Sequence, residues 1–512
     1  MRQSLTRPFL PPPPEIATPA SRVRNDGMSG ITALPPHVAH LGRKPQQVRR
    51  HIGILLCVIR SKLAIAACKS SAAALRLLGR GGTNLPGRIA LAIDPSLLAT
   101  LSRGMHVTVV TGTNGKTTTS RMIEEMFTRA GYAYFANKSG ANLFPGITGV
   151  FAQHSPLVGA SGYTHALIEC DEAAFRTVSQ FLPVDTLIVN NIFRDQLDRF
   201  GEISHTLEAI RTGIANIPDA TLCLNADCSL TSSLADGVPN RVVWFGVNTP
   251  IYKDAVAELS DAPYCIKCKT EYEYGWHTFG HLGGFACPNC GYSRHTPDVA
   301  VTEVLSTGAS QSHIRLDIAG SEHEARINLP GGYNIYNAAG ATTVAHVGGI
   351  DDDVIIGALG TFECGFGRAE EIEIGATRAR MMLVKNPAGF NQVINLIAND
   401  EGTYQLAFVL NDRFADGTDI SWIWDVDFEA LARTHERFER IVVGGVRADD
   451  MAVRLKYASF PTERLEIMRS DDAILDALGE SETPTFIMPT YTAMFDMRTA
   501  ISRRTELKAF YE

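Results

Sequence analysis

Short apolar segments rich in β-branched residues alternate with amphipathic helical segments along most of the chain. The first unit begins at His106 with a β-branched stretch, passes through a Gly-rich turn, and continues into a helix whose apolar residues within 122–127 share one face. Further strands are predicted at 166–168, 186–189 and 221–224, with helical stretches between them. This alternation predicts a parallel α/β sheet whose first strand leads into the Gly-rich turn.

The alternation of strands and helices resumes beyond Arg368. Strands are predicted at 381–384, 406–410, 440–443 and 485–488. We interpret residues 61–369 as a central domain and residues 370–512 as a C-terminal, Rossmann-like α/β domain. The segment 262–296 is rich in aromatic residues and glycine and has no apolar helical stripe, so we predict an inserted module there.

The N-terminal part of the chain shows no sustained periodicity. It contains several Arg and a Pro run at 11–14, and we predict a disordered extension over residues 1–60; a sequence that begins too early is an equally good explanation. Residues 52–67 are fairly apolar, but Arg60 and Lys62 interrupt them and the stretch is too short to span a bilayer. We expect an amphipathic helix there.

The composition is that of a globular protein with more than one domain. The 512 residues are 45% hydrophobic and 20% charged, which is enough apolar material for sizeable cores. A net charge of −8 and a pI near 6.0 give no overall basic field, so no nucleic-acid partner is expected. Ten cysteines in so long a chain do not resemble a secreted disulfide framework, and we expect a reducing, cytoplasmic environment.

The Gly-rich turn after the first strand carries the strongest chemical signal. In such a loop the backbone N–H groups and the helix N-terminus bind phosphates, a Lys neutralises the outer phosphates, and a hydroxyl reaches Mg2+. Val110 occupies the first Gly position of the general pattern, and an ordinary glycine turn is the alternative, but strand, Gly-Lys pair, hydroxyl and helix occur together. We predict that the nucleotide is bound by Gly112, Thr113, Asn114, Gly115, Lys116, Thr117 and Thr118, with Thr117 also a magnesium ligand.

Two Cys-x2-Cys pairs in the insert have the spacing of a zinc site. Cys265 and Cys268 form the first pair, and Cys287 and Cys290 form the second. Four thiolates leave no open position for a substrate, so we predict a structural Zn2+ that stabilises a small ribbon. The nearby histidines 277, 281 and 295 are interpreted as surface or packing residues.

The shortened loop Gly-Thr-Asn-Gly-Lys-Thr-Thr resembles that of the Mur ligase and folylpolyglutamate synthetase superfamily, and further segments in matching order extend the resemblance over about residues 65–510. The resemblance implies a Mur ligase-type central P-loop ATPase domain that uses ATP and Mg2+. It makes Glu169, at the end of a strand, a magnesium ligand. The alternative is that the acidic residues there are solvated at the end of the strand and bind no metal. Gln196 stands where many Mur ligases have a metal-binding His, so a second metal site is not carried over.

Other segments add candidate residues by the same resemblance. Asn334 and Asn337 in Gly-Gly-Tyr-Asn-Ile-Tyr-Asn are candidate contacts on the adenine side, and Arg368 in Gly-Arg-Ala-Glu is a candidate phosphate contact. Lys385 and Asn386 in Lys-Asn-Pro-Ala-Gly are candidate contacts to the substrate or an acyl phosphate.

The short region before the P-loop, Gln196, the four-cysteine insert and the C-terminal segments together resemble the MurT family, the ligase subunits of lipid II isoglutaminyl synthases. This implies ATP-dependent amidation of the D-glutamate α-carboxylate of lipid II to D-isoglutamine through an acyl phosphate, at the inner face of the membrane. The ammonia would come from a GatD-type glutaminase in a heterodimer, since none of the non-zinc cysteines lies in a convincing nucleophile turn.

In that family the last Asp of the Asp-Gly-x-Asp-x-Ser-Trp segment is a catalytic residue that completes the partner's Cys-His pair. Here it falls on Asp419, with Asp416 as second choice. An ordinary turn built from Asp and Gly is the alternative reading of this segment.

Two other functions remain open from the sequence. A Mur or folyl-type ligase that adds an amino acid to a carboxylate would share ATP, magnesium and the acyl phosphate. A zinc-ribbon ATPase that binds nucleic acid or acts as a scaffold belongs to another class, and the pI near 6.0 and the Mur-like segments argue against it.

Overall fold

The computed structural model describes the chain from residue 44 to residue 505 with short gaps. For residues 44–56 and 368–370 it describes the backbone alone. The described ranges are 44–77, 84–137, 141–194, 203–252, 260–308, 310–362 and 368–505. The chain divides into two units, residues 1–57 and 58–512, and of the first unit only the beginning of one helix is described. That helix continues into the second unit, which contains all the other described elements.

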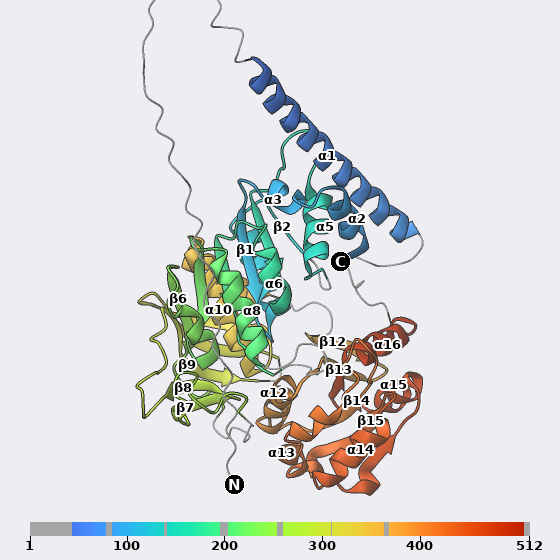
Figure 1. Ribbon diagram of the computed structural model, residues 1–512. Coiled ribbons are helices and arrows are strands. Elements are labelled where there is room, and N and C mark those ends of the chain that lie inside the picture. The colour runs from blue at the N-terminus through green and yellow to red at the C-terminus, as the bar shows by residue number, and fades with distance from the viewer. Residues whose placement is uncertain are drawn as a thin grey trace, which may run out of the picture. The chain divides into compact units, whose positions relative to one another are not determined.

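A nine-stranded sheet organises the part of the chain that contains the P-loop (Figure 1). Its order is β11-β10-β9-β6-β5-β4-β1-β3-β2. The neighbours in the run β9-β6-β5-β4-β1-β3-β2 are parallel, whereas β10 pairs antiparallel with β9 and with β11. The strands are β1 (His106–Thr111), β2 (Tyr134–Ala136), β3 (His165–Glu169), β4 (Thr186–Val189), β5 (Thr221–Asn225), β6 (Val242–Val247), β9 (Val299–Thr307), β10 (Ser312–Ile318) and β11 (Ser321–Ile327).

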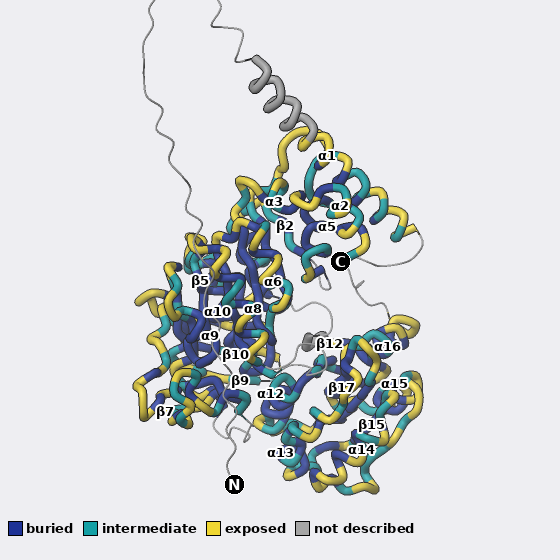
Figure 2. The backbone as a smooth tube through the Cα atoms, in the orientation of Figure 1, coloured by how far each residue is buried: buried dark blue, intermediate teal, exposed yellow. Residues whose placement is uncertain are grey.

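The sequence of each strand matches its place in this sheet. β4 is buried at every position, as expected of a parallel strand covered on both faces, whereas β10 alternates between buried and half-buried positions. Figure 2 shows the buried residues gathered along these strands. The helices of this part are α1 (Lys44–Leu77), α2 (Asn84–Ile93), α3 (Leu97–Leu101), α4 (Lys116–Arg129), α5 (Phe144–His154), α6 (Glu172–Val178), α8 (Ile203–Ala215), α9 (Ser229–Ser232), α10 (Gly332–Val347) and α11 (Asp352–Thr361), with a 3-10 turn at Ser233–Ala235.

The four-cysteine insert contains a small antiparallel hairpin. It is formed by β7 (Glu273–Phe279) and β8 (Leu282–Ala286), and the two Cys-x2-Cys pairs flank it in the sequence.

A second sheet of six strands follows, in the order β12-β13-β17-β14-β15-β16. β12 and β13 pair antiparallel and the other neighbours are parallel. Leu406 and Phe408 of β14 belong to one apolar cluster and Ala407 and Val409 to another, so the sheet is covered on both faces.

The elements of this second part are the strands β12 (Arg368–Ile374), β13 (Thr377–Met382), β14 (Tyr404–Val409), β15 (Phe438–Gly444), β16 (Leu465–Ile467) and β17 (Thr485–Pro489), the helices α12 (Pro387–Ala398), α13 (Glu429–Ala432), α14 (Ala448–Tyr457), α15 (Asp471–Gly479) and α16 (Tyr491–Ser502), and 3-10 turns at Ser421–Asp425, His435–Arg437 and Thr462–Arg464.

The predicted α/β class is confirmed, with both parallel arrays present. The strand predicted at 381–384 was placed too late, since β13 begins at Thr377 where its antiparallel pairing with β12 starts. The helix predicted at 52–67 is longer and covers Lys44–Leu77. Of the predicted extension, residues 1–43 lie outside the described residues and 44–60 belong to α1. The domain limits at 61–369 and 370–512 stay predictions.

Among the helices that the structure describes, none has the length and apolar content needed to cross a membrane.

Candidate nucleotide and metal sites

The P-loop joins β1 to α4 by a turn that only glycine fits. Gly112 and Gly115 have φ angles of 116° and 85°, in the region that favours glycine. A Cβ on Gly115 would overlap the side-chain oxygen of Asn337 on α10. The loop backbone therefore follows a path that carries it in front of the α4 N-terminus, the arrangement that binds phosphate.

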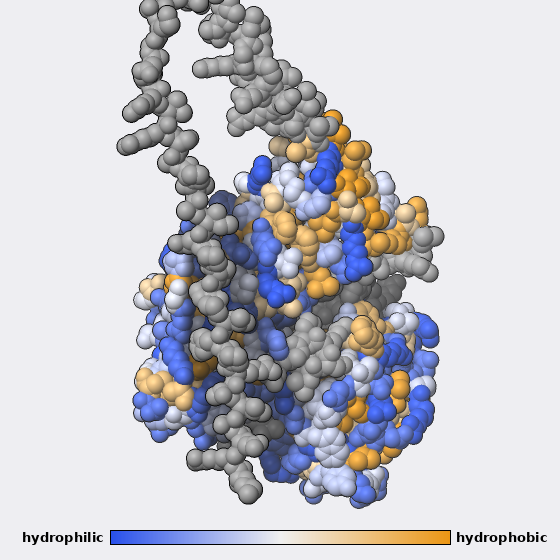
Figure 3. Space-filling model, in the orientation of Figure 1, coloured by the Kyte–Doolittle hydropathy of each residue, from blue (hydrophilic) through white to orange (hydrophobic). Residues whose placement is uncertain are grey.

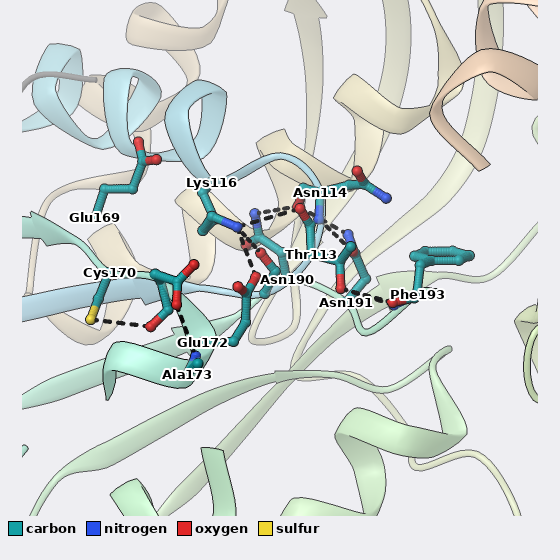
Figure 4. A network of polar contacts seen from close by, with 12 residues as sticks. Thr113, Asn114, Lys116, Glu169, Cys170, Glu172, Ala173, Asn190, Asn191 and Phe193 are labelled. Atoms are coloured by element: carbon teal, nitrogen blue, oxygen red, sulfur yellow. Dashed lines mark hydrogen bonds and ion pairs between the residues drawn. The ribbon is translucent and has the colours of Figure 1, made fainter. Parts of the chain in front are cut away.

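Two consecutive asparagines after β4 hold this loop in place (Figure 4). The main-chain carbonyl oxygen of Asn191 accepts from the Thr113 backbone N–H at 2.9 Å, and its side-chain Oδ1 accepts from the Asn114 backbone N–H at 2.9 Å. The Asn190 amide donates to Thr119 Oγ1 at 2.9 Å. Neither residue was assigned a role from the sequence; the available signal was two amides directly after a buried strand, at the carboxyl edge of the parallel sheet.

Lys116 is enclosed by acceptors at the start of α4. Its Nζ lies 2.7 Å from Glu172 Oε1 and 2.7 Å from the Gly112 carbonyl oxygen. Burial by itself lowers the pKa of Lys116, but the ion pair with Glu172 and the nearby Glu169 and Asp171 carboxylates outweigh it and raise that pKa. Lys116 is therefore a cation whose charge is directed at the loop, and Glu172 is a partner that sequence reasoning did not single out.

The two predicted magnesium ligands are brought together. Thr117 Oγ1 donates to Glu169 Oε2 at 2.7 Å, although the residues are 52 positions apart. The Asn137 side chain accepts from the Glu169 backbone N–H and donates to its carbonyl oxygen, both at 2.7 Å. A hydroxyl and a carboxylate beside a phosphate-binding loop are the oxygen ligands that Mg2+ prefers, so these residues fit the ion.

The two candidate adenine-side residues lie on the first turns of α10. Asn337 Nδ2 donates to Asn334 Oδ1 at 3.0 Å, and Asn337 Oδ1 accepts from Thr119 Oγ1 of α4 at 3.3 Å. Both asparagines are buried, and the bond from Thr119 to Asn337 connects α10 to the P-loop helix. Their contact with adenine stays a prediction. Arg368 is the first residue of β12, and its side chain lies outside what the structure describes.

The four cysteines of the insert form a single cluster. Their sulfur atoms all lie within 4.8 Å of one another, with Cys265 to Cys290 at 3.6 Å and Cys268 to Cys287 at 3.4 Å. A tetrahedral zinc with Zn–S bonds of about 2.3 Å requires S–S separations of about 3.8 Å. The cluster therefore fits a metal ion held by four thiolates.

The backbone around the cysteines repeats the same turn twice. In each Cys-x2-Cys pair, the residue that follows the second cysteine closes the turn by bonding back to the first cysteine. Lys269 N–H donates to the Cys265 carbonyl oxygen at 2.8 Å, and Gly291 N–H donates to the Cys287 carbonyl oxygen at 3.1 Å. Lys269 and Gly291 both have positive φ angles, 64° and 73°.

The three histidines of the insert pack against neighbouring rings, as expected. His277 stacks on Tyr274, His295 stacks on Trp244, and His281 lies against Phe193 with ring centroids 4.5 Å apart. Within the described residues the candidate metal cluster contains the four cysteines alone.

The turn of the insert hairpin also lies against the P-loop side of the site. Phe279 and His281 both contact the ring of Phe193. The backbone N–H of Phe193 donates to Thr113 Oγ1 at 3.0 Å, and the Thr113 hydroxyl donates to the Phe193 carbonyl oxygen at 3.2 Å. A single aromatic residue thus connects the insert to the P-loop.

A second connection joins the insert to α10. Tyr336, which lies between the two candidate asparagines in the sequence, shares a hydrogen bond with Thr278 of β7 at 2.7 Å and donates to the buried Asp227 carboxylate at 2.6 Å. Arg294 of the insert also contacts Asp227, at 2.5 Å. Burial raises the pKa of Asp227. The charge of Arg294 and the hydrogen bonds from Tyr336 and Val247 lower that pKa but offset the effect of burial only in part.

The loop after β14 presents Asp419 to solvent and buries Asp416. Asp419 Oδ1 accepts from Ser421 N–H at 2.8 Å, and that bond lowers the pKa of Asp419. Asp416 instead accepts from the backbone N–H (2.6 Å) and hydroxyl (2.5 Å) of Thr492. Asp416 therefore fixes the loop, and Asp419 is the carboxylate that remains accessible from outside.

The KNPAG segment begins α12. Asn386 caps the helix by accepting from Gly389 N–H at 2.8 Å, and its Nδ2 donates to Asn114 Oδ1 of the P-loop at 3.2 Å. Lys385 is half-buried beside it. Their contact with substrate stays a prediction, but Asn386 does lie beside the nucleotide loop.

Comparison with known proteins places this site in a family. A Mur ligase middle domain matches residues 110–289, and a MurT ligase C-terminal domain matches residues 383–494. The lipid II isoglutaminyl synthase (glutamine-hydrolyzing) subunit MurT of Streptococcus pneumoniae is 33% identical over 87% of this chain and 98% of its own length. The chain belongs to the MurT family of Mur ligases. The subunit of the same name from Staphylococcus aureus is 30% identical over 88% of this chain and 99% of its own length.

Solved structures agree on the fold. A pseudomurein peptide ligase type C from Methanothermus fervidus aligns with a TM-score of 0.60 at 20% identity, over 80% of this chain and 81% of that one. MurF ligase from Thermotoga maritima, in complex with ADP, aligns with a TM-score of 0.54 at 13% identity, over 81% and 85%. The expected Mur ligase-type fold is therefore confirmed, and this member of the MurT family is an ATP-dependent ligase.

Proposed function

We propose that this chain is the synthetase subunit of a lipid II isoglutaminyl synthase, which amidates the D-glutamate α-carboxylate of lipid II to D-isoglutamine. The observation that carries the proposal is the match to subunits of that name over nearly their whole length. It is supported by a phosphate-binding loop with an adjacent oxygen pair, Thr117 and Glu169. The enzyme would act at the cytoplasmic face of the membrane, in peptidoglycan synthesis.

In the proposed reaction ATP supplies the phosphoryl group that converts the carboxylate to an acyl phosphate, and ammonia then attacks the acyl carbon while phosphate leaves. Residues 112–118 would hold the phosphates, with Lys116 neutralising their charge. Thr117 and Glu169 would hold Mg2+, and Asn334 and Asn337 would bind on the adenine side.

The residues proposed nearest the transferred group are Arg368, Lys385 and Asn386. Asn386 lies 3.2 Å from the P-loop residue Asn114, which supports its role. A cation at Lys385 would attract the negatively charged acyl phosphate.

We further propose that ammonia comes from a GatD-type glutaminase bound to this chain as a heterodimer. Asp419 would orient a histidine of that partner and stabilise its cationic form. Its exposure, against the burial of Asp416, supports Asp419 as the catalytic carboxylate. The four cysteines would hold a structural Zn2+, since thiolates fill every position of a tetrahedral site.

The test is mass spectrometry of lipid II incubated with the protein, ATP and Mg2+, with ammonium or with glutamine plus a GatD-type glutaminase. Replacement of one hydroxyl by an amino group, with ATP consumed, is the expected product in both mixtures. No change with either nitrogen source, together with addition of a whole residue when free amino acids are present, would contradict the proposal and favour an amino-acid-adding ligase.

A further inference from the structure

The basic residues of this chain are concentrated at its N-terminal end. Residues 1–77 contain 12 Lys or Arg and two Asp or Glu, whereas residues 78–512 contain 35 and 53. The acidic pI of the whole chain conceals this separation. One end of the chain is therefore suited to an anionic surface, while the remainder would be repelled by it.

Helix α1 carries most of this positive charge. Its 34 residues include seven of the 12 basic residues and no acidic residue. No carboxylate within the helix neutralises them, so the attraction of α1 for an anion is a property of the whole helix.

The inner face of α1 is fixed by packing. Ile65 and Cys68 are fully buried in an apolar cluster with Ala90 of α2 and Leu97 of α3. Ser61 Oγ donates to Asp94 at 2.7 Å on the same side. Because these contacts set the rotation of the helix about its axis, they also decide which side chains point outward.

The outward face is apolar. Ile59, Leu63 and Leu77 are 47%, 59% and 89% exposed. Positions 59, 63, 66, 70, 73 and 77 follow the three-and-four spacing of one helix face, and only Ser70 among them is polar. Figure 3 shows this apolar surface where α1 and α2 lie.

A row of positive charge borders that face. Lys62, Lys69 and Arg76 are spaced seven residues apart, which places them along one edge of the helix. Lys62 also donates to the Pro156 carbonyl oxygen at 3.0 Å, and because this acceptor is uncharged the positive charge of Lys62 is not neutralised by it. An apolar stripe with a basic edge is the pattern of helices that lie in the interface of an anionic membrane.

We propose that the outer face of α1 docks on an anionic phospholipid bilayer, with its apolar stripe in the interface and its basic edge at the head groups. The choice of a membrane rests on the proposed function, whose substrate is lipid-anchored. Residues 1–43 contain five Arg and two acidic residues, so like charge argues against that segment as the occupant, and the same holds for a second copy of α1. Nucleic acid would match the charge and leave the apolar stripe unused.

The test is co-sedimentation of the full-length protein with phosphatidylglycerol and phosphatidylcholine vesicles that contain no lipid II. We expect tighter binding to phosphatidylglycerol, at least tenfold weaker binding for Leu63→Glu, and about fivefold weaker binding for Lys69→Gln. Leu305→Glu, on the exposed side of β9, is the matched control and should bind as the unaltered protein does.

Equal binding of the unaltered protein and Leu63→Glu would overturn the proposal. Displacement by duplex DNA, together with no effect of Leu63→Glu, would assign the basic end to nucleic acid instead. Amidation of detergent-solubilised lipid II gives a separate readout: Leu63→Glu should retain it, so loss of vesicle binding and failure of the proposed function are distinguishable.

Discussion

Gly115 shows how closely the nucleotide loop is packed at the residue scale. We expect Gly115→Ala to weaken ATP binding at least tenfold, about 1.4 kcal/mol or more, because the added methyl group both strains a backbone with φ of 85° and overlaps Asn337. Isothermal titration with ATP measures the effect. Gly104→Ala is the matched control, since Gly104 also has a positive φ but open space around it. Equal losses in both variants would attribute the effect to backbone strain alone.

Asp419 allows ammonia supply to be separated from amidation. Asp419→Asn should abolish glutamine-dependent amidation while it retains ATP binding and ammonium-dependent amidation, because a neutral amide no longer stabilises a protonated histidine. Product formation is followed with each nitrogen source. Asp219→Asn, at another exposed aspartate, serves as control. Full glutamine-dependent activity in Asp419→Asn would remove this residue from the catalytic assignment.

His281 should make the stability of the protein depend on pH. Burial lowers its pKa to about 4, whereas an unfolded histidine titrates near about 6.5. The unfolded state then binds more protons than the native state, so stability falls as the pH drops from about 6.5 through about 4, by up to about 3 kcal/mol. Thermal unfolding across this range should be less pH-dependent for His281→Leu, and unchanged for His205→Leu at an exposed histidine. Parallel profiles for the unaltered protein and His281→Leu would show that the buried imidazole does not contribute.

At the scale of elements, the insert hairpin contacts both sides of the candidate nucleotide site. Its turn reaches the P-loop through Phe193, and its first strand reaches α10 through Thr278 and Tyr336. The sequence predicted the cysteine pairs because their spacing is local. It gave no sign of these contacts, which join residues as distant as Thr113 and Phe193, 80 positions apart.

This arrangement predicts that removing the proposed Zn2+ weakens nucleotide binding. Chelation, or Cys268→Ser, should lower zinc content and raise the ATP dissociation constant several-fold, because a loosened hairpin no longer supports Phe193 and Tyr336. Metal analysis and nucleotide titration are the two readouts, and adding zinc back to the chelated protein should restore both. An unchanged ATP affinity in zinc-free, folded protein would mean that the insert does not support the site.

At the scale of the whole molecule, each sheet has its own apolar core. One cluster surrounds the nine-stranded sheet, and two others cover the faces of β14 and its neighbours in the six-stranded sheet. We therefore expect two thermal transitions in calorimetry. ATP with Mg2+ at about one hundred times its dissociation constant should stabilise the transition of the P-loop core by about 2.7 kcal/mol and the other much less. Equal shifts of both, or a single transition, would show that the cores unfold as one unit.

The sequence by itself determined the features that residues near one another in the chain can specify. These are the strand, turn and helix of the P-loop, the alternation that produces two α/β sheets, and the paired cysteines, and each depends on a short periodicity or a fixed spacing. Helix α1 ran beyond its predicted limits at both ends: residues 44–51 are mostly polar and gave no apolar signal, and the apolar residues after 67, such as Cys68 and Ala72, were left out of the predicted helix.

Only the tertiary structure decided which distant groups meet. The pairing of Lys116 with Glu172, the support of the loop by Asn190, and the approach of Asn337 to Gly115 join residues from separate strands and helices. Parallel strands bring their carboxyl ends to one edge of a sheet, but the order of the strands decides which ends become neighbours. That order is set by the packing of both faces into a common core, and no local pattern of the sequence contains it.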